Sequence, residues 1–506
     1  MLKAKLKYVA LLTGILVSSS VLAANSVYNT EIPASIMTPD KVETHLGVLH
    51  FKDGVPSQQT MERLYDNLDT MRATEVFLNA IPMASLEALR IGHQKMGVKQ
   101  SHQVMLFDNL MDSNPLFLTG NTDTVYASAF LDLEKDGPTV VEIPPGMGPT
   151  TVNDAFFRFV TDMGVVGPDR GKGGKYLILP PNYEGDIPEG YHVSRSTSYV
   201  NWFIARGFLK DGKTDAAVDA YHSGLKIYPL AKKGNPPKMT FVSGSGKSFN
   251  TIHANDEHFY DEIKVVIDKE PVEFIDPELR GLIATIGIQK GKPFEPDDRM
   301  QKILKEGAAI GNATARALMF NPRTDNAYIW DDRNWKTAFI GKDYQWLIDG
   351  GNGGRNLDAR TYFFYMATVN TPAMALKMVG KGSQYAIVDK TGEGEFFEGS
   401  KNYRLTIPAN VPAKNFWSVV VYDTQTRSEL QTSQPFPSKN DQRDKMIENP
   451  DGSVDLYFGP TAPDGKDANW IQTVPEKGWF AILRMYGPLE HWYDGSWKPS
   501  DITEVK

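Results

Sequence analysis

Residues 121–144 read NTDTVYASAFLDLEKDGPTVVEIP, and this stretch indicates the fold of the first half of the chain. Two runs rich in β-branched, aromatic and small residues, 124–133 and 139–143, are separated by an Asp-Gly-Pro turn. Short runs of this composition, bounded by Gly and Pro and with no helical period between them, are typical of neighbouring strands. The stretch therefore predicts a β-sheet.

The strand pattern continues beyond this stretch. Residues 155–167 read AFFRFVTDMGVVG and residues 175–181 read KYLILPP, with Pro-Pro-Gly and Gly-Lys-Gly-Gly turns before them. Several strands without intervening helices are typical of an antiparallel sandwich. We therefore expect a first β sandwich here, interrupted by one helix near residues 214–225.

Two other stretches have a helical pattern. At residues 57–97 apolar side chains recur three or four positions apart, and Pro82 is expected to open a second helix within this stretch. Asp297 is a typical N-cap for a helix that continues to Met319 and is rich in alanine and glycine. Small side chains allow close approach, so we expect the two helical stretches to form one unit.

From Tyr362 to the end the pattern is again typical of strands. Residues 402–408 (NYRLTIP) and 453–459 (SVDLYFG) alternate apolar and polar side chains, whereas residues 415–423 (NFWSVVVYD) and 479–487 (WFAILRMYG) are apolar on both faces. Half-buried strands beside fully buried ones predict two stacked sheets, as in a jelly roll.

Several of these phrases also carry a family resemblance. NTDTVYASAFLDLEKDGP at residues 121–138, IGIQKGKPFEP at residues 286–296, and downstream NFWSVVVYD, NPDGSVDLYFG, NW and ILRMYGP resemble a bacterial exported family. That family is catalogued as domains of unknown function 1254, N-terminal, and 1214, C-terminal. The resemblance implies a helical domain, an immunoglobulin-like sandwich and a C-terminal jelly-roll-like sandwich, and it implies no activity.

The expected fold class is therefore mainly β with a helical domain. We expect the following boundaries: signal peptide 1–23, N-terminal arm and helical part 24–105, first sandwich 106–265, helical connector 266–345 packing against 55–100, and second sandwich 346–506.

The first residues predict export. Three lysines precede an apolar run from Tyr8 to Val17, and small residues lead to Ala23. A charged start, a short apolar core and small residues at the end are the three regions of a signal peptide. A membrane anchor would need roughly 20 apolar residues. We expect cleavage near Ala23, a periplasmic or secreted protein, and no later transmembrane segment.

Composition excludes some classes of partner. The chain has 54 Lys and Arg against 62 Asp and Glu, a formal charge of -8, and no cysteine. Nucleic-acid binding depends on clustered basic residues, so we expect no nucleic-acid partner. Without disulfides the fold must depend on burial, which a chain of 506 residues can supply.

No cofactor or metal motif is complete. The loop SGSGKS at residues 243–248 ends like a phosphate-binding loop, but Phe241 occupies the position of the first required glycine. His253 and His258 are five residues apart, whereas paired helical ligands are typically four apart. We therefore expect no cofactor and no metal.

One candidate group carries acid–base side chains. Asp123 and Tyr126 stand at the start of the first strong strand, and Arg158 and Asp162 share one face of the later predicted strand at residues 155–167, with Asp154 in line before them. An acid, a phenol and a buried Asp–Arg pair in one cleft could transfer protons or orient an anion. The alternatives are turn chemistry at Asp123 and an exposed charged ladder at Arg158.

A second candidate group is aromatic. Arg484 and Tyr486 share a face of one predicted strand, and Trp417 and Tyr422 lie on another in the same domain. A buried Arg among aromatic side chains must find a partner. Tryptophans beside polar residues in loops suit a sugar or a flat ligand, and they suit domain packing equally well. These are Trp330, Trp335, Trp346, Trp470, Trp492 and Trp497.

The sequence thus leaves three functions open. The first is an exported protein that binds a small organic molecule or glycan in an interdomain cleft, with ligand residues Trp417, Tyr422, Trp470, Arg484 and Tyr486. The second is a metal-independent hydrolase or lyase that uses Asp123, Tyr126, Arg158 and Asp162. The third is an envelope protein that acts through partners.

Overall fold

The computed structural model describes residues 30–505, and the predicted signal peptide lies outside these residues. The chain is mixed α/β, with 28% helix, 27% strand and several open sheets. Helix therefore has a larger share than the mainly β prediction gave it. The chain divides into two compact units, the first ending at Asp66 and the second beginning at Asn67. In the described part, no helix is long and apolar enough to cross a membrane.

The first unit contains a small antiparallel sheet. Its strands are β1 (Lys41–Thr44), β2 (Gly47–Lys52) and β3 (Val55–Pro56), in that order. The first two turns of the following helix hold the sheet: Thr60 accepts the His50 N–H at 3.0 Å, and Arg63 donates to the Leu46 carbonyl at 3.1 Å.

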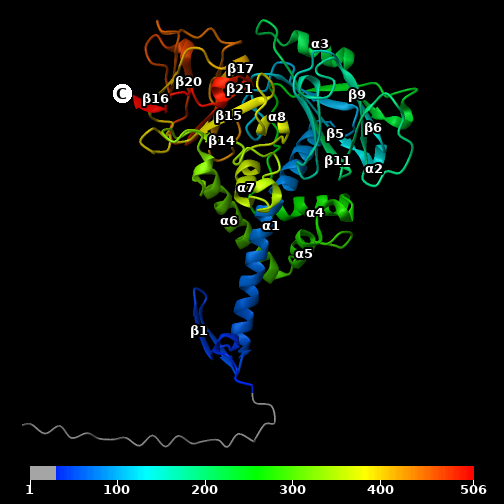
Figure 1. Ribbon diagram of the computed structural model, residues 1–506, viewed down its shortest axis with the longest axis vertical. Coiled ribbons are helices and arrows are strands. Elements are labelled where there is room, and N and C mark those ends of the chain that lie inside the picture. The colour runs from blue at the N-terminus through cyan, green and yellow to red at the C-terminus, as the bar shows by residue number, and fades with distance from the viewer. Residues whose placement is uncertain (1–29, 506) are drawn as a thin grey trace, which may run out of the picture. The chain divides into compact units, whose positions relative to one another are not determined.

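The second unit begins with two stacked sheets (Figure 1). The six-stranded sheet has the order β13-β4-β5-β11-β7-β8 and the four-stranded sheet the order β10-β9-β6-β12. Buried side chains of both, such as Leu131 and Ile178, form one core. β13 pairs with β4, and β10 with β9, in parallel, so the sheets are mixed and not purely antiparallel. The strands are β4 (Gln103–Leu106), β5 (Val125–Asp132), β6 (Thr139–Ile143), β7 (Thr150–Asp154), β8 (Phe159–Met163), β9 (Gly174–Leu179), β10 (His192–Arg195), β11 (Val200–Gly207), β12 (Lys226–Pro229) and β13 (Thr240–Ser243).

A second pair of sheets follows towards the C-terminus. Its five-stranded sheet has the order β14-β15-β21-β17-β18 and its four-stranded sheet the order β20-β19-β16-β22. Leu483 of the first and Leu405 of the second share one core. The four strands that the sequence predicted are confirmed. The strands are β14 (Lys336–Thr337), β15 (Ser383–Val388), β16 (Asn402–Ile407), β17 (Ala413–Asp423), β18 (Ser438–Asn440), β19 (Val454–Gly459), β20 (Trp470–Gln472), β21 (Trp479–Pro488) and β22 (Thr503–Val505).

Helices and short 3-10 turns occur in both units, and α1 begins in the first unit and continues into the second. Figure 1 shows α8 between the two groups of sheets. Added Cβ atoms on Gly307 and Gly311 of α6 would lie 2.5 Å from Ala73 and 2.7 Å from Phe77 of α1, so these glycines allow the two helices to touch. The helices are α1 (Gln58–Lys95), α2 (Leu133–Asp136), α3 (Asp215–Gly224), α4 (Phe259–Lys269), α5 (Pro277–Thr285), α6 (Asp298–Phe320), α7 (Leu357–Met366), α8 (Pro372–Ala375) and α9 (Glu490–Tyr493). Short 3-10 turns occur at η1 (Ala34–Ile36), η2 (Gly164–Val166), η3 (Leu230–Lys232), η4 (Val272–Phe274), η5 (Asp325–Ala327), η6 (Asp349–Gly351) and η7 (Asp467–Asn469).

Three predictions of local structure were wrong. Pro82 does not open a second helix but lies inside α1, because the burial of the helix around it outweighs the lost hydrogen bond. Tyr362 is in helix α7 and not in a strand, since a helix buried on all sides has no readable period. Its N-cap, Asn356, accepts the Ala359 N–H at 3.0 Å.

The third correction concerns residues 155–167, predicted as one strand. A tight turn separates β7 from β8, with Phe157 in the left-handed region at φ 55°. Asp154 nucleates the turn because its Oδ1 accepts the backbone N–H groups of Phe156 and Arg158, each at 2.8 Å. Asp154 and Arg158 are therefore paired across a turn, at 2.6 Å, rather than in line along a strand.

Candidate functional site

An arginine and a tyrosine face each other across two strands of the six-stranded sheet. Arg206 on β11 is the direct cross-strand partner of Tyr126 on β5, and its guanidinium carbon lies 6.0 Å from the centre of the phenol ring. Alternation along the strands places Phe203 and Ala205 in the sandwich core and turns Ile204 and Arg206 to the opposite face. Both members of the pair are buried.

The five-stranded sheet carries a second pair of the same kind. Arg484 on β21 is the cross-strand partner of Tyr385 on β15, with the guanidinium carbon 5.3 Å from the ring centre. Arg484 is held by neutral oxygens: it donates to the Tyr422 hydroxyl at 2.6 Å and to the carbonyls of Thr119 and Gly120 at 2.5 and 3.0 Å. It has no carboxylate partner among the described residues.

A cavity of about 40 Å³ lies between the two pairs and is lined by all four side chains. A water needs about 10–15 Å³ of such space, so the cavity has room for about three waters or for one small molecule. Two basic and no acidic side chains line it. Apart from Thr119 and Thr368, its remaining wall is apolar: Phe117, Ile204, Ala338, Phe363, Met366, Ala367, Val369, Met374, Ile387 and Ile482.

Arg206 is the unusual member of this site. Its Nε is buried without a hydrogen-bond partner, and Nη2 has only the thioether sulfur of Met374, at 3.9 Å. No ion pair of Arg206 occurs in the described part of the chain. A buried charge normally has an ionic or strong hydrogen-bond partner because desolvation is costly. Arg206 therefore presents to the cavity a positive charge that no carboxylate contacts directly.

Two buried acids lie in the neighbourhood of the two arginines without forming an ion pair with Arg206. Asp162 and Arg206 line an adjoining cavity of about 10 Å³, but no ion pair joins them. Burial raises the pKa of Asp162 to about 6, although Thr371 donates to its Oδ2 at 2.7 Å. Burial also raises the pKa of Glu429 well above its usual range, and neither of its oxygens has a partner.

Backbone strain is concentrated at the same cavity. Thr119 and Val369 line it with φ of 42° and 66°, in the left-handed region that β-branched residues rarely adopt. Each such residue costs about 1–3 kcal/mol, and strain of this kind clusters at functional sites. The strained backbone positions support a functional role for the cavity.

Asp123 connects the two groups of sheets rather than facing the cavity. This fully buried carboxylate accepts hydrogen bonds from Ser418 at 2.6 Å, Asn440 at 2.9 Å and Tyr486 at 3.1 Å. The three donors lie on β17, β18 and β21, whereas Asp123 precedes β5. The carboxylate oxygens are satisfied, so the arrangement is that of a structural clasp.

The structure brings together only some of the predicted residues. Tyr126 and Arg484 line the cavity, Tyr422 holds Arg484, and Tyr486 holds Asp123. Asp162 lines the adjoining cavity, whereas Arg158 lines a third one elsewhere. The four residues of the predicted catalytic group therefore do not converge on one pocket.

The predicted aromatic residues lie outside the cavity. Trp417 is buried in the core of the C-terminal sheets, and the indole N–H of Trp470 donates to the Gly459 carbonyl at 2.9 Å. Arg206 and Tyr385 were missed by sequence reasoning. Arg206 ends an apolar strand, VNWFIARG, just as Arg484 interrupts WFAILRMYG, and this shared signal could have identified it.

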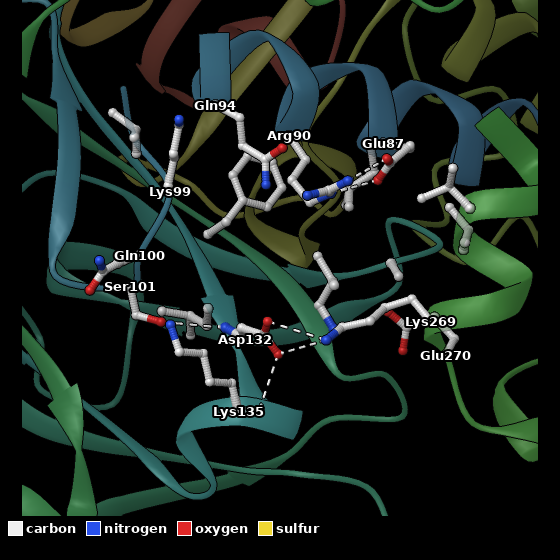
Figure 2. A pocket seen from close by; sticks show the side chains of 18 of the residues that line it. Glu87, Arg90, Gln94, Lys99, Gln100, Ser101, Asp132, Lys135, Lys269 and Glu270 are labelled. Carbon is white, nitrogen blue, oxygen red and sulfur yellow. Dashed lines mark hydrogen bonds and ion pairs between the residues drawn. The ribbon is translucent and has the colours of Figure 1, made fainter. Parts of the chain in front are cut away.

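A larger cavity of about 240 Å³ between α1, β5 and α4 is shown in Figure 2. Its charges compensate each other: Arg90 pairs with Glu87 at 2.5 Å, and Lys269 pairs with Asp132 at 3.1 Å. Four acidic and four basic side chains line it. Because the acidic and basic side chains are equal in number, the lining of this cavity favours neither an anionic nor a cationic ligand.

The histidines that flank residues 254–257 do not form a metal site. His253 is buried, with its Nδ1 2.8 Å from the Ala254 carbonyl, and burial lowers its pKa to about 4. His258 is exposed and pairs with Asp256 at 3.0 Å. No group of three potential metal ligands occurs in the described residues.

The neighbouring Glu262 gives a testable pH dependence. Burial raises the pKa of Glu262 to about 8, although both of its oxygens accept the Ala254 N–H, at 3.2 and 3.3 Å. A carboxyl whose pKa is raised in the folded state binds a proton there that the unfolded state releases, so stability falls as pH rises through this window. Between pH 6.5 and 8 the loss from Glu262 is about 2 kcal/mol, since one pKa unit corresponds to about 1.4 kcal/mol.

The variant Glu262→Gln should therefore show a flatter loss of unfolding free energy between pH 6.5 and 8 than the wild-type protein, in urea titrations at each pH. Exposed Glu273, changed to Gln, is the matched control and should keep the wild-type slope. Equal slopes for all three proteins would contradict a protonated Glu262.

Two family models match separate parts of the chain. The family model "Protein of unknown function (DUF1254)" matches residues 102–229, and "Protein of unknown function (DUF1214)" matches residues 382–490. Residues 286–296, which also carried the resemblance, lie outside both matches. No curated protein matches the chain.

Two solved structures are similar. The VPA0106 protein from Vibrio parahaemolyticus is 17% identical with a TM-score of 0.53, over 87% of this chain and 100% of that one. An uncharacterised protein from Burkholderia cenocepacia is 12% identical with a TM-score of 0.40, over 88% of this chain and 96% of that one. At its level of identity the first likeness shows a shared fold only. The family matches thus identify a DUF1254 domain at residues 102–229 and a DUF1214 domain at residues 382–490.

Proposed function

We propose that this protein binds a small organic anion, of the size of formate or acetate, in the cavity between Arg206 and Arg484. The observation that carries the proposal is the buried guanidinium of Arg206, which meets no oxygen acceptor among the described residues. A carboxylate accepts two parallel N–H bonds from a guanidinium and supplies the missing negative charge. The phenols of Tyr126 and Tyr385 stand beside the two cations.

The size of the cavity limits both the ligand and its affinity. A space of about 40 Å³ excludes a glycan, so the proposal narrows the wider prediction of a small molecule or glycan to a small anion. Very small ligands gain at most about 1.5 kcal/mol per non-hydrogen atom. Acetate would therefore bind with about -6 kcal/mol at best, which corresponds to a dissociation constant of about 40 µM or weaker. Assays need millimolar ligand.

Binding is favoured over acid–base catalysis by the placement of the ionisable groups. A hydrolase or lyase that used Asp123, Tyr126, Arg158 and Asp162 would need them around one reacting centre. Arg158 lines a different cavity, and Asp123 already accepts hydrogen bonds from three neutral donors. We therefore propose a ligand-binding role.

The cellular setting belongs to the same proposal. We propose that the protein is exported through a signal peptide cleaved near Ala23 and works in the periplasm or outside the cell. We also propose that the N-terminal pair of sheets in the second unit is immunoglobulin-like and the C-terminal pair jelly-roll-like. The shared core between the sheets of each pair supports this assignment.

The variant Arg206→Met tests the binding site. Wild-type protein should be stabilised by acetate or formate by about 1.4–2.7 kcal/mol at 10–100 times the dissociation constant, seen as a rise of a few degrees in Tm. Arg206→Met should lose this shift while its own Tm is unchanged or raised, because an apolar side chain replaces a buried unpaired charge.

The controls separate specific binding from general salt effects. Arg404 is exposed on β16, and Arg404→Met should respond to acetate as the wild type does. Neutral acetamide at equal ionic strength should shift no protein. An equal acetate shift in Arg206→Met would contradict the site, and a flat response to every small anion would favour the alternative of an envelope protein that acts through partners.

A further inference from the structure

A separate cavity of about 340 Å³ lies beside the turn between β7 and β8. Its walls come from this turn, from the start of α5, from the loop at residues 344–355 and from α7. All of these elements belong to the second unit. The volume is in the usual range of small-molecule sites, about 300–1,000 Å³.

Positive charge is in excess at this cavity. Four arginines line it (Arg158, Arg195, Arg355 and Arg360) against two aspartates. The aspartates are already engaged. Asp154 accepts hydrogen bonds from Arg158 and from the Thr197 hydroxyl, each at 2.6 Å, and Asp276 caps α5 by accepting the Leu279 N–H at 2.9 Å. The excess charge contrasts with the acidic character of the whole chain, whose formal charge is -8.

Three polar groups at the cavity lack partners. The indole N–H of Trp346 has no acceptor, although this side chain is only 3% exposed. The Nε of Arg360 has no acceptor either, while its Nη2 donates to Asn79 at 2.7 Å. The amide nitrogen of Asn370 donates to the carbonyls of Phe157 and Tyr344, whereas its Oδ1 has no donor. Buried polar groups are usually satisfied, so the two unmet donors, on Trp346 and Arg360, indicate a missing ligand that can accept hydrogen bonds.

Arg355 and Arg360 repel each other. Burial and, to a smaller extent, the positive charge of Arg355 lower the pKa of Arg360 to about 10. Burial also lowers the pKa of Arg355. An anion bound between the two guanidinium groups would remove this repulsion.

The rest of the wall is aromatic. Phe156 lies under two cations, with the guanidinium carbons of Arg158 and Arg360 at 5.6 and 5.8 Å from its ring centre. Phe364 and Trp346 form the facing side, at 5.0 Å between ring centres. Phe157 and Trp346 both have a φ of 55°, and such strain in non-glycine residues is typical of functional sites.

From this arrangement we infer that the cavity beside the β7–β8 turn is a second ligand site, for an organic anion that joins a carboxylate to an aromatic body. Arg355 and Arg360 bind the carboxylate, and Phe156, Phe364 and Trp346 contact the ring. The site is independent of the small cavity between Arg206 and Arg484, with which it shares no lining residue.

Calorimetric titration with 2-naphthoate tests this inference. The wild-type protein should bind it, whereas neutral 2-naphthalenemethanol and inorganic sulfate, which have only the ring or only the charge, should bind at least 10-fold more weakly. Arg360→Met removes one charge-assisted donor and should raise the dissociation constant about 10- to 100-fold. Arg404→Met, far along the chain on β16, should bind as the wild type does.

Further variants keep the test decisive. Arg355 is exposed, so Arg355→Met should fold normally. It should also weaken naphthoate binding. This variant therefore tests the site even if Arg360→Met is unstable. Arg206→Met should bind naphthoate normally, because this ligand exceeds the small cavity. Equal affinity in Arg360→Met and Arg404→Met, equal binding of the neutral analogue, or no binding by the wild type would each overturn the inference. Failure of the acetate experiment alone would leave it standing.

Discussion

Replacing Asp123 by alanine is expected to lower the free energy of unfolding by about 3–5 kcal/mol. The carboxylate is fully buried and accepts hydrogen bonds from Ser418, Asn440 and Tyr486, which belong to three strands of the C-terminal sheet. Its removal leaves three buried donors without an acceptor in a place that water cannot easily enter. The loss should also loosen the contact between the DUF1254 and DUF1214 domains.

Urea unfolding followed by tryptophan fluorescence measures this effect, with Asp464→Ala as the control. Asp464 is exposed, so its replacement should change the unfolding free energy by less than about 0.5 kcal/mol. Asp123→Asn should lie between the two, because an amide oxygen can still accept one of the three bonds. A loss in Asp123→Ala no larger than in the control would show that the clasp does not stabilise the protein.

Lys336→Met is expected to destabilise the protein by a similar amount, about 3–5 kcal/mol, because it leaves a buried carboxylate without its cation. Lys336 and Asp389 form an ion pair at 2.5 Å with side chains only 2% and 4% exposed. The ammonium group also donates to the carbonyls of Met319 and Phe320 at the end of α6, at 3.1 and 3.3 Å. One side chain thus joins the helix to the C-terminal sheet.

The double variant Lys336→Met with Asp389→Leu separates the two contributions. With both charges replaced by apolar groups, most of the lost stability should return, since a buried ion pair adds little over a well-packed apolar pair. The remaining deficit measures the loss at the end of α6. Lys445→Met, at an exposed position, should unfold like the wild type. No recovery in the double variant would contradict a penalty from an unpaired Asp389.

Some residues at the cavity between Arg206 and Arg484 could be predicted from the sequence, because a charged residue inside an apolar strand is easily recognised. Arg484, Tyr422 and Tyr486 stood out in fully buried strands, and they do lie at or next to the cavity. Arg206 also lies in an apolar strand, but the sequence analysis did not predict it as a site residue. Its importance depends on which acceptors it lacks, and sequence periodicity says nothing of partners more than a few residues away.

Arg158 shows the opposite failure. A strict period of two placed it on one strand with Asp162, but the side chain of Asp154 captures two backbone N–H groups and turns the chain. That local competition between side chain and backbone moved Arg158 into another cavity.

The sequence by itself determined the local elements and the family. Alternation in residues 402–408 and 453–459, the buried strands 415–423 and 479–487, the N-cap at Asp297 and the helix near 214–225 were all readable, because periodicity and capping are properties of neighbouring residues. Only the tertiary structure decided the sites. Arg206 and Arg484 are 278 positions apart, and the cavity beside the β7–β8 turn is lined by residues from 154 to 370. The charges, the backbone strain and the missing partners of both cavities therefore exist only after sheets and helices have packed.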